Sequence, residues 1–91
     1  MSSGIWRVEF DRDAARDLRK LDAPARKEIL RYLRSRISTS EDSRRFGKPL
    51  LGELKGLWRY RVGDYRIVAK IEDPRLIVLV VTVGHRHEVY D

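Results

Sequence analysis

The chain has 91 residues, of which 42% are hydrophobic, so a single small globular domain over residues 1–91 is expected. The absence of cysteine excludes disulfides and thiolate metal sites, and the net charge of +6 favours an anionic partner. The longest apolar run, Leu76 to Val81, is too short to span a bilayer, and the first four residues lack the layout of a secretory signal, so we expect a cytoplasmic protein with no membrane partner.

The first half of the chain predicts one strand and two helices. Ile5 to Phe10 alternates large apolar and charged residues, which is typical of a half-buried strand. Apolar residues then recur at helical spacing over 12–21 and again over 23–37. Asp11 and Asp22 precede these two segments, where an aspartate side chain can cap a first helical turn. The helices are expected to form a hairpin that covers one face of a sheet.

The second half predicts the rest of that sheet. Residues 38–48 are polar and indicate a loop, and Pro49 to Leu54 is expected to form a short edge strand. Two β-rich runs within Leu57 to Glu72 flank Gly63-Asp64, which is a strong signal for a hairpin turn. Leu76 to Val83 then forms a near-continuous apolar strand, expected to be central and covered on both faces. The fold class is therefore α+β, with a two-helix hairpin on one face of a mainly antiparallel sheet in β-α-α-β-β-β order.

The predicted hairpin has two chemically different faces, because side chains alternate along a strand. One face is apolar and aromatic, and is a core face: Trp58, Tyr60, Val62, Tyr65, Ile67, Ala69 and Ile71. The other face carries four cations, with Leu57 and Val68 between them: Arg59, Arg61, Arg66 and Lys70. In the text below these are called the core face and the second face.

The cations of the second face require an explanation. Like charges directly opposite on a sheet destabilise it by up to about 1 kcal/mol per pair, and no carboxylate lies on this face before Glu72. An anionic ligand would account for the cluster, because the planar fork of arginine can bind two phosphate oxygens at once. The alternative is an ordinary solvated sheet face. Residues 43–70 hold eight Lys/Arg and two Asp/Glu, and such a localised basic field attracts nucleic acid first of all.

The strand order also brings the end of the chain to the hairpin turn. The last strand runs antiparallel to the one before it, so its end returns to Gly63-Asp64 and the tail emerges beside Arg61 and Arg66. Four tail residues with useful chemistry are expected there: His85, Arg86, His87 and Tyr90. Structural alternatives exist for several of these residues, since Tyr90 can pack on the sheet and the histidines can be exposed. Arg61 on the hairpin can likewise be purely structural.

These residue types suit cleavage of an RNA phosphodiester without a metal. The 2′-hydroxyl of the substrate is the nucleophile, so the protein need only hold the phosphate, offset charge on its oxygens and move two protons. Arg66, with Arg59 or Arg61, would supply the electrostatic part. Arg86 is a poor proton carrier, because the pKa of an arginine side chain is so high.

The other tail residues are better candidates for carrying the two protons. Tyr90 would stack on a base or hydrogen-bond the attacking hydroxyl. His85 or His87 titrates near neutral pH and would carry a proton. No third ligand accompanies the two histidines and no glycine-rich phosphate loop precedes a helix, so neither a metal nor a small-molecule cofactor is predicted.

Two stretches resemble a known family. Residues 57–67 read Leu-Trp-Arg-Tyr-Arg-x-Gly-x-Tyr-Arg-Ile, and residues 83–90 read Val-Gly-His-Arg-x-x-Val-Tyr. Together, and with the order of elements, they resemble the RelE group of the RelE/ParE superfamily of toxins from bacterial and archaeal type II toxin–antitoxin systems. The resemblance implies a RelE-like fold and a ribosome-dependent mRNA interferase that cuts mRNA in the A site, leaves a cyclic phosphate and is neutralised by a cognate antitoxin.

The resemblance also implies roles for individual residues. The family positions that carry activity match Arg59, Arg66, Arg86 and Tyr90. Leu57 stands where the family has a further lysine, Arg59 stands where a lysine is frequent, and His85 would compensate. The predicted catalytic set is therefore Arg59, Arg66, Arg86, Tyr90 and His85. The predicted RNA-binding set is Arg61, Lys70, Arg44, Arg45, Lys48 and His87.

Two further functions are compatible with the sequence. A ParE-like toxin would share the fold but inhibit DNA gyrase, and would not need the convergent arginines and tyrosine. A non-catalytic RNA-binding module would use the same basic face. An antitoxin is expected to present an acidic or amphipathic segment to the basic side or to displace the tail, although binding to the helical side is the alternative.

Overall fold

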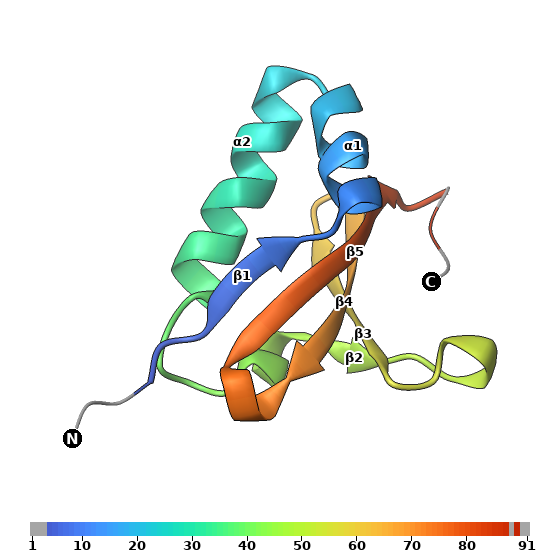
Figure 1. The fold of residues 1–91 in the computed structure, drawn as a ribbon. Coiled ribbons are helices and arrows are strands. Elements are labelled where there is room, and N and C mark those ends of the chain that lie inside the picture. Colours follow the sequence, from blue (N-terminus) through green and yellow to red (C-terminus); the bar gives the residue numbers. More distant parts are fainter. Residues whose placement is uncertain (1–3, 88, 90–91) are drawn as a thin grey trace.

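The sheet places a parallel strand pair at one edge and an antiparallel hairpin at the other. The structure is a computed structural model that describes residues 4–87 and 89 (Figure 1). Its five strands lie in the order β1-β5-β4-β3-β2, with β1 parallel to β5 and every other pair antiparallel. Their bounds are β1 Arg7–Phe10, β2 Lys48–Pro49, β3 Leu57–Val62, β4 Tyr65–Glu72 and β5 Ile77–His85.

Two helices lie side by side on one face of this sheet (Figure 1). They are α1 (Arg12–Lys20) and α2 (Ala23–Tyr32), and α2 continues as a π-helical segment, Leu33–Ile37. Both predicted caps are confirmed, because Asp11 Oδ1 accepts a hydrogen bond from Ala14 N at 2.8 Å and Asp22 Oδ1 accepts one from Ala25 N at 3.0 Å. Among the described residues, no helix is long and apolar enough to span a membrane.

The predicted hairpin register is confirmed and defines the core. Val62 pairs with Tyr65 and Arg61 pairs with Arg66 across the turn, where Gly63 has a φ of 59° that favours glycine. The core face packs against the helices in one cluster, which includes Tyr60, Val62, Ile67 and Ala69 from the hairpin and Ile29, Leu33 and Ile37 from the second helical segment. The α+β prediction with helices on one face is therefore correct.

Two predictions about strands need correction. The edge strand expected over Pro49 to Leu54 is only Lys48–Pro49, followed by a 3₁₀ turn at Gly52–Leu54 that projects from the sheet (Figure 1). Gly52 and Gly56 have φ values of 67° and 101°, which a continuous strand cannot accommodate. β5 is central as predicted, but the helices cover only one of its faces, and Leu79, Val81 and Thr82 remain half-buried.

A small second cluster lies on the second face. Leu50 and Val68 are buried there together with Val89, which comes from the tail. The described part of the tail therefore turns back onto the face that carries Arg59 and Arg66, rather than extending away from it.

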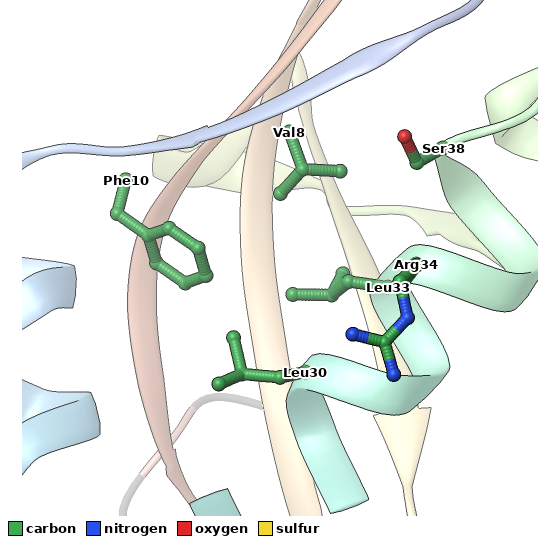
Figure 2. A pocket seen from close by; sticks show the side chains of 6 residues that line it. All are labelled: Val8, Phe10, Leu30, Leu33, Arg34 and Ser38. Carbon is green, nitrogen blue, oxygen red and sulfur yellow. The ribbon is translucent and has the colours of Figure 1, made fainter. Parts of the chain in front are cut away.

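An apolar depression of about 290 Å³ opens at the β1 edge of the core. Figure 2 shows Val8 and Phe10 of β1 facing Leu30 of α2 and Leu33 of its π-helical extension. Arg34 and Ser38 lie at the rim. No carboxylate or histidine lines it among the described residues, so it offers no catalytic set.

Candidate functional site

The start of the tail is joined to the hairpin turn. The Arg86 backbone N–H donates to the Asp64 carbonyl at 2.7 Å, and Arg86 Nη1 lies 3.8 Å from Asp64 Oδ1. Two residues earlier in the β4–β5 ladder, Gly84 pairs with Arg66. The placement of Arg86 and Arg66 at the same end of the hairpin therefore agrees with the position expected from the strand order.

Two arginines of the second face are buried. Arg66 is 2% exposed and Arg59 is 7% exposed. Burial of a guanidinium is costly unless its N–H groups find acceptors, and Arg66 Nη1 donates to the carbonyl oxygens of Gly63 at 3.1 Å and Tyr65 at 3.0 Å. The turn backbone thus fixes the Arg66 side chain before any ligand arrives. A phosphate that reached this guanidinium would meet it in partly water-excluded surroundings, where electrostatic attraction is stronger than in water.

Two lysines lie next to these arginines and keep the second face cationic. Lys48 of β2 pairs with Arg59, and Lys70 of β4 pairs with Leu57 and Leu79 on its two sides. Both lysines are exposed. Because directly opposite residues in an antiparallel pair share a face, Lys48 adds a cation to the row that contains Arg59.

Arg61 lies at the open edge of this group. It is exposed and lines a depression with residues of α2, on the helix side of the β3 edge. Arg61 pairs directly with Arg66 in the β3–β4 ladder, so both residues belong to the second face, as the alternation of the strand predicts.

His85 also lies apart from Arg66. Its ring packs edge-on against Tyr65, with centroids 5.7 Å apart, and Tyr65 belongs to the core face. His87 stacks on His85 at 4.9 Å, and the His87 backbone N–H donates to His85 Nδ1 at 3.3 Å. In a neutral imidazole this bond places the proton on Nε2. The structure therefore brings the two histidines together but directs His85 to the face opposite Arg66.

Two predicted RNA-binding arginines form ion pairs away from the hairpin turn. Arg44 donates to both carboxylate oxygens of Asp73, at 2.9 and 2.6 Å, and its guanidinium lies 5.6 Å over the Trp58 ring. The hydrogen bond from Arg44 lowers the pKa of Asp73 below its ordinary value. Arg45 pairs with Glu41 at 3.1 Å. Charge counting could not foresee this, because Asp73 is distant from Arg44 in the sequence.

Tyr60 anchors the segment that carries these two arginines. The phenol O–H of Tyr60 donates to the carbonyl oxygen of Ser43 at 2.7 Å, and both residues are fully buried. Burial raises the pKa of Tyr60 to about 12. The alternation of the hairpin predicts Tyr60 as a core residue, but nothing in the sequence indicates its partner.

Asp17 is a residue that sequence reasoning missed. Its Oδ2 accepts a hydrogen bond from the Val83 backbone N–H at 3.2 Å, which ties α1 to the end of β5. Gly84 follows directly and Arg86 lies three residues after Val83, so Asp17 helps to position the tail. An acidic residue in the middle of α1 gave no signal of this role, because the contact depends on how the helix lies across the sheet.

Tyr90, which completes the predicted catalytic set, lies outside the described residues. Within the described ranges, no group of three or more His, Asp or Glu side chains is placed to hold a metal ion. The arrangement that the structure supports is a row of cations on the second face, fixed at the hairpin turn and joined there by Arg86.

The sequence of the chain matches known proteins over most of its length. Residues 8–90 match a family model described as the ParE toxin of the type II toxin–antitoxin system parDE. The chain is 33% identical over 85 residues to the toxin RelG of Mycobacterium tuberculosis, covering 93% of this chain and 95% of that protein. It is 31% identical over 85 residues to the toxin RelE of the same organism, covering 93% and 86%.

Solved structures give the same result. A chain of the toxin–antitoxin complex RelBE2 from Mycobacterium tuberculosis superposes with a TM-score of 0.84 at 32% identity, covering 93% of this chain and 95% of that one. The isolated RelE toxin of Escherichia coli superposes with a TM-score of 0.68 at 22% identity, covering 88% and 83%, which shows likeness of fold.

Proposed function

The chain belongs to the RelE group of the RelE/ParE superfamily of type II toxins, and we propose that it is a ribosome-dependent mRNA interferase. In this reaction the substrate 2′-hydroxyl attacks the adjacent phosphorus in the A site. The bond from phosphorus to the 2′-oxygen forms, the bond to the 5′-oxygen breaks, and a cyclic phosphate remains. The observation that carries the proposal is the hydrogen bond between Arg86 and Asp64, which joins the tail to the cationic hairpin.

The proposed electrostatic work falls to the arginines. Arg66 and Arg59, with Lys48 and Lys70 beside them, bind the phosphate and offset the charge that develops on its oxygens. Arg66 is held by the turn carbonyls, so little reorganisation is needed when the substrate binds. Arg86 is exposed at the turn and approaches the same phosphate from the tail.

The proton transfers require other groups. The 2′-hydroxyl must lose a proton and the 5′-oxygen must gain one, and an arginine side chain stays protonated in proteins. The role of Tyr90 at the attacking hydroxyl stays a prediction. His85 faces Tyr65, so its proposed contribution is to position the tail.

The test is cleavage in a purified translation system. With the protein added, primer extension on a translated mRNA should reveal new ends within codons, and these should disappear when ribosomes are omitted. Arg86→Ala should lower the cleavage rate by about 100-fold or more, as expected for loss of a group that stabilises transition-state charge. Arg7→Ala is the matched control, since Arg7 is also exposed but lies on β1 at the other edge of the sheet.

Two outcomes would contradict the proposal. Equal cleavage by the wild type and by Arg86→Ala would remove Arg86 from the mechanism. RNA binding with no cleavage at any ribosome concentration would instead indicate a non-catalytic RNA-binding module.

A second candidate function is inhibition of DNA gyrase, because the matching family model is described as a ParE toxin. Purified gyrase would then lose supercoiling activity in the presence of the protein, while translated mRNA stayed intact. The two relatives at 31% and 33% identity, named RelE and RelG, support the mRNA interferase as the first choice.

The proposed protein partner is a cognate antitoxin, as found in the toxin–antitoxin complexes among the similar structures. We expect it to place an acidic or amphipathic segment against the basic side of the hairpin. Its affinity should fall steeply with salt, because contacts between exposed charges are screened. An affinity that does not change between low and physiological salt would indicate binding to another surface.

A further inference from the structure

A second basic site lies on the helix side of the β3 edge. It is a depression of about 260 Å³ between α2 with its π-helical extension and the end of β3, called the α2–β3 groove below. Arg31, Arg36 and Arg61 all line it and all are exposed. Glu28 is the single carboxylate among its described lining residues.

These arginines differ from several others in the described chain. Arg7, Arg16 and Arg75 each lie within 4 Å of a neighbouring carboxylate. Among the described residues, no such ion pair involves a groove arginine, and Arg36 instead lies 5.3 Å over the ring of Phe46. Three like charges around one depression repel one another, so an anion that enters the groove lowers the electrostatic free energy.

The groove is continuous with the proposed catalytic face. Arg61 pairs with Arg66 across the hairpin, and β2 pairs only with Trp58 and Arg59. The β3 edge beside Arg61 is therefore not covered by β2. A chain that lies on the second face at Arg66 can cross this open edge and enter the groove at Arg61.

We propose that the α2–β3 groove binds the sugar–phosphate backbone of single-stranded RNA. The inference rests on the proposed function, because the bound segment continues the strand whose phosphate reaches Arg66. Guanidinium forks match phosphate oxygens in geometry as well as charge. Beside the groove, Phe46 is 41% exposed with Arg45 4.6 Å over its ring, and such aromatic and guanidinium surfaces stack bases.

A protein segment fits this site less well. A helical peptide would need a continuous apolar lining, and the described lining contains only Tyr32 and Val62 as large or apolar side chains besides the arginine stems. An extended polyanion needs only the spaced charges that the groove supplies.

The experiment measures binding of a fluorescent 2′-O-methyl oligonucleotide of 12 nucleotides by anisotropy. This probe has no free 2′-hydroxyl and cannot be cleaved, so binding is read independently of catalysis. Each phosphate contact on a single strand contributes about 0.7 to the salt slope of log affinity, which is about fourfold in affinity near 0.15 M salt. Arg31→Ala, Arg36→Ala and Arg61→Ala should each weaken binding by about fourfold.

The triple variant gives the sharpest contrast. Replacing all three groove arginines by alanine should weaken binding by about 50-fold and lower the salt slope by about 2. The matched control replaces Arg7, Arg12 and Arg16 by alanine, which removes the same charge from exposed positions on β1 and α1. The control should weaken binding by about twofold or less, because long-range attraction is screened at this salt concentration.

One variant should improve binding, which misfolding cannot imitate. Glu28→Gln removes the carboxylate at the groove and should tighten the oligonucleotide complex by about twofold or more, within the fourfold of a single phosphate contact. Unchanged or weaker binding would count against the groove as an RNA site.

The outcomes separate this inference from the proposed function. If the triple variant of the groove arginines and the triple control variant bind the oligonucleotide equally while cleavage on the ribosome persists, the groove inference is wrong and the mRNA interferase stands. If the groove triple loses binding although no cleavage occurs with any variant, the groove binds RNA and the proposed function is wrong. If a ten-residue polyglutamate peptide loses affinity for the groove triple and the oligonucleotide does not, the groove serves a protein partner and the inference is overturned.

Discussion

Tyr60→Phe tests the link between the hairpin and the segment that carries Arg44. The substitution removes one phenol O–H, which donates to the Ser43 carbonyl at 2.7 Å, and changes nothing else in the volume of the core. Both residues are fully buried, so water cannot replace the lost donor. Leaving a buried acceptor unpaired costs about 1–3 kcal/mol. In a domain of this size a loss of about 2 kcal/mol lowers the Tm by about 8–16 °C.

The same variant has a defined pH dependence. Burial raises the pKa of Tyr60 to about 12. The pKa of a tyrosine in an unfolded chain is about 10. The folded state therefore holds the phenol proton more tightly than the unfolded state. The stabilising contribution of the neutral phenol is complete below the unfolded pKa and is lost as the pH rises through the folded one. Wild type should thus lose more stability than Tyr60→Phe as the pH rises above the ordinary tyrosine value.

The assay is thermal unfolding followed by circular dichroism at neutral and at alkaline pH. Ser43→Ala is the matched control, because its side-chain oxygen has no hydrogen-bond partner among the described residues while its carbonyl keeps the bond to Tyr60. It should leave the Tm unchanged or raise it. Equal Tm values for wild type and Tyr60→Phe at neutral pH, or a difference that stays constant into the alkaline range, would refute the reasoning.

Two further predictions concern the core edge and the end of β5. Leu33→Ala should lower the free energy of unfolding by about 2–5 kcal/mol, because Leu33 is 3% exposed. Leu30→Ala in the same depression should lower it by less than about 1 kcal/mol, because Leu30 is 38% exposed. Equal losses for the two variants in urea unfolding would show that this edge is not packed as described. Asp17→Ala removes the acceptor of the Val83 N–H, so kcat for mRNA cleavage should fall by about tenfold or more through misplacement of the tail. Asp17→Asn keeps an acceptor oxygen and should restore most of this rate, and identical rates for the two variants would remove Asp17 as a positioning residue.

The hairpin and both helices were predictable because their signals are local. Gly63 adopts the positive φ that a two-residue turn requires, and this one position sets the register of both strands and hence the face of every side chain. Asp11 and Asp22 marked the helix starts through bonds to residues three positions away. The edge strand failed because Gly52, inside it, adopts a positive φ that starts a turn.

The site was predictable only in part, because its remaining features depend on contacts between distant residues. The strand order placed Arg86 at the hairpin turn, and the bond to Asp64 agrees with that placement. The strand order alone did not reveal that His85 faces Tyr65. Extending the alternation of side chains along β5 to His85 would have indicated this contact. The pairing of Arg44 with Asp73 lies across 29 positions and has no local signal.

The basic field is therefore built from different residues than the charge count over 43–70 suggests. Glu41 and Asp73 lie just outside that window, yet they fold back onto Arg45 and Arg44 and offset two of its cations. Arg31 and Arg36 also lie outside it, in a segment of nearly balanced charge, but the fold turns both toward Arg61.

Cations thus line both sides of the β3 edge, with Arg66 on the second face and Arg61 in the α2–β3 groove. A single phosphate can occupy one side only. A ligand that uses both must be an extended polyanion that crosses this edge, which is a geometric reason to expect a nucleic-acid strand instead of a small phosphorylated metabolite.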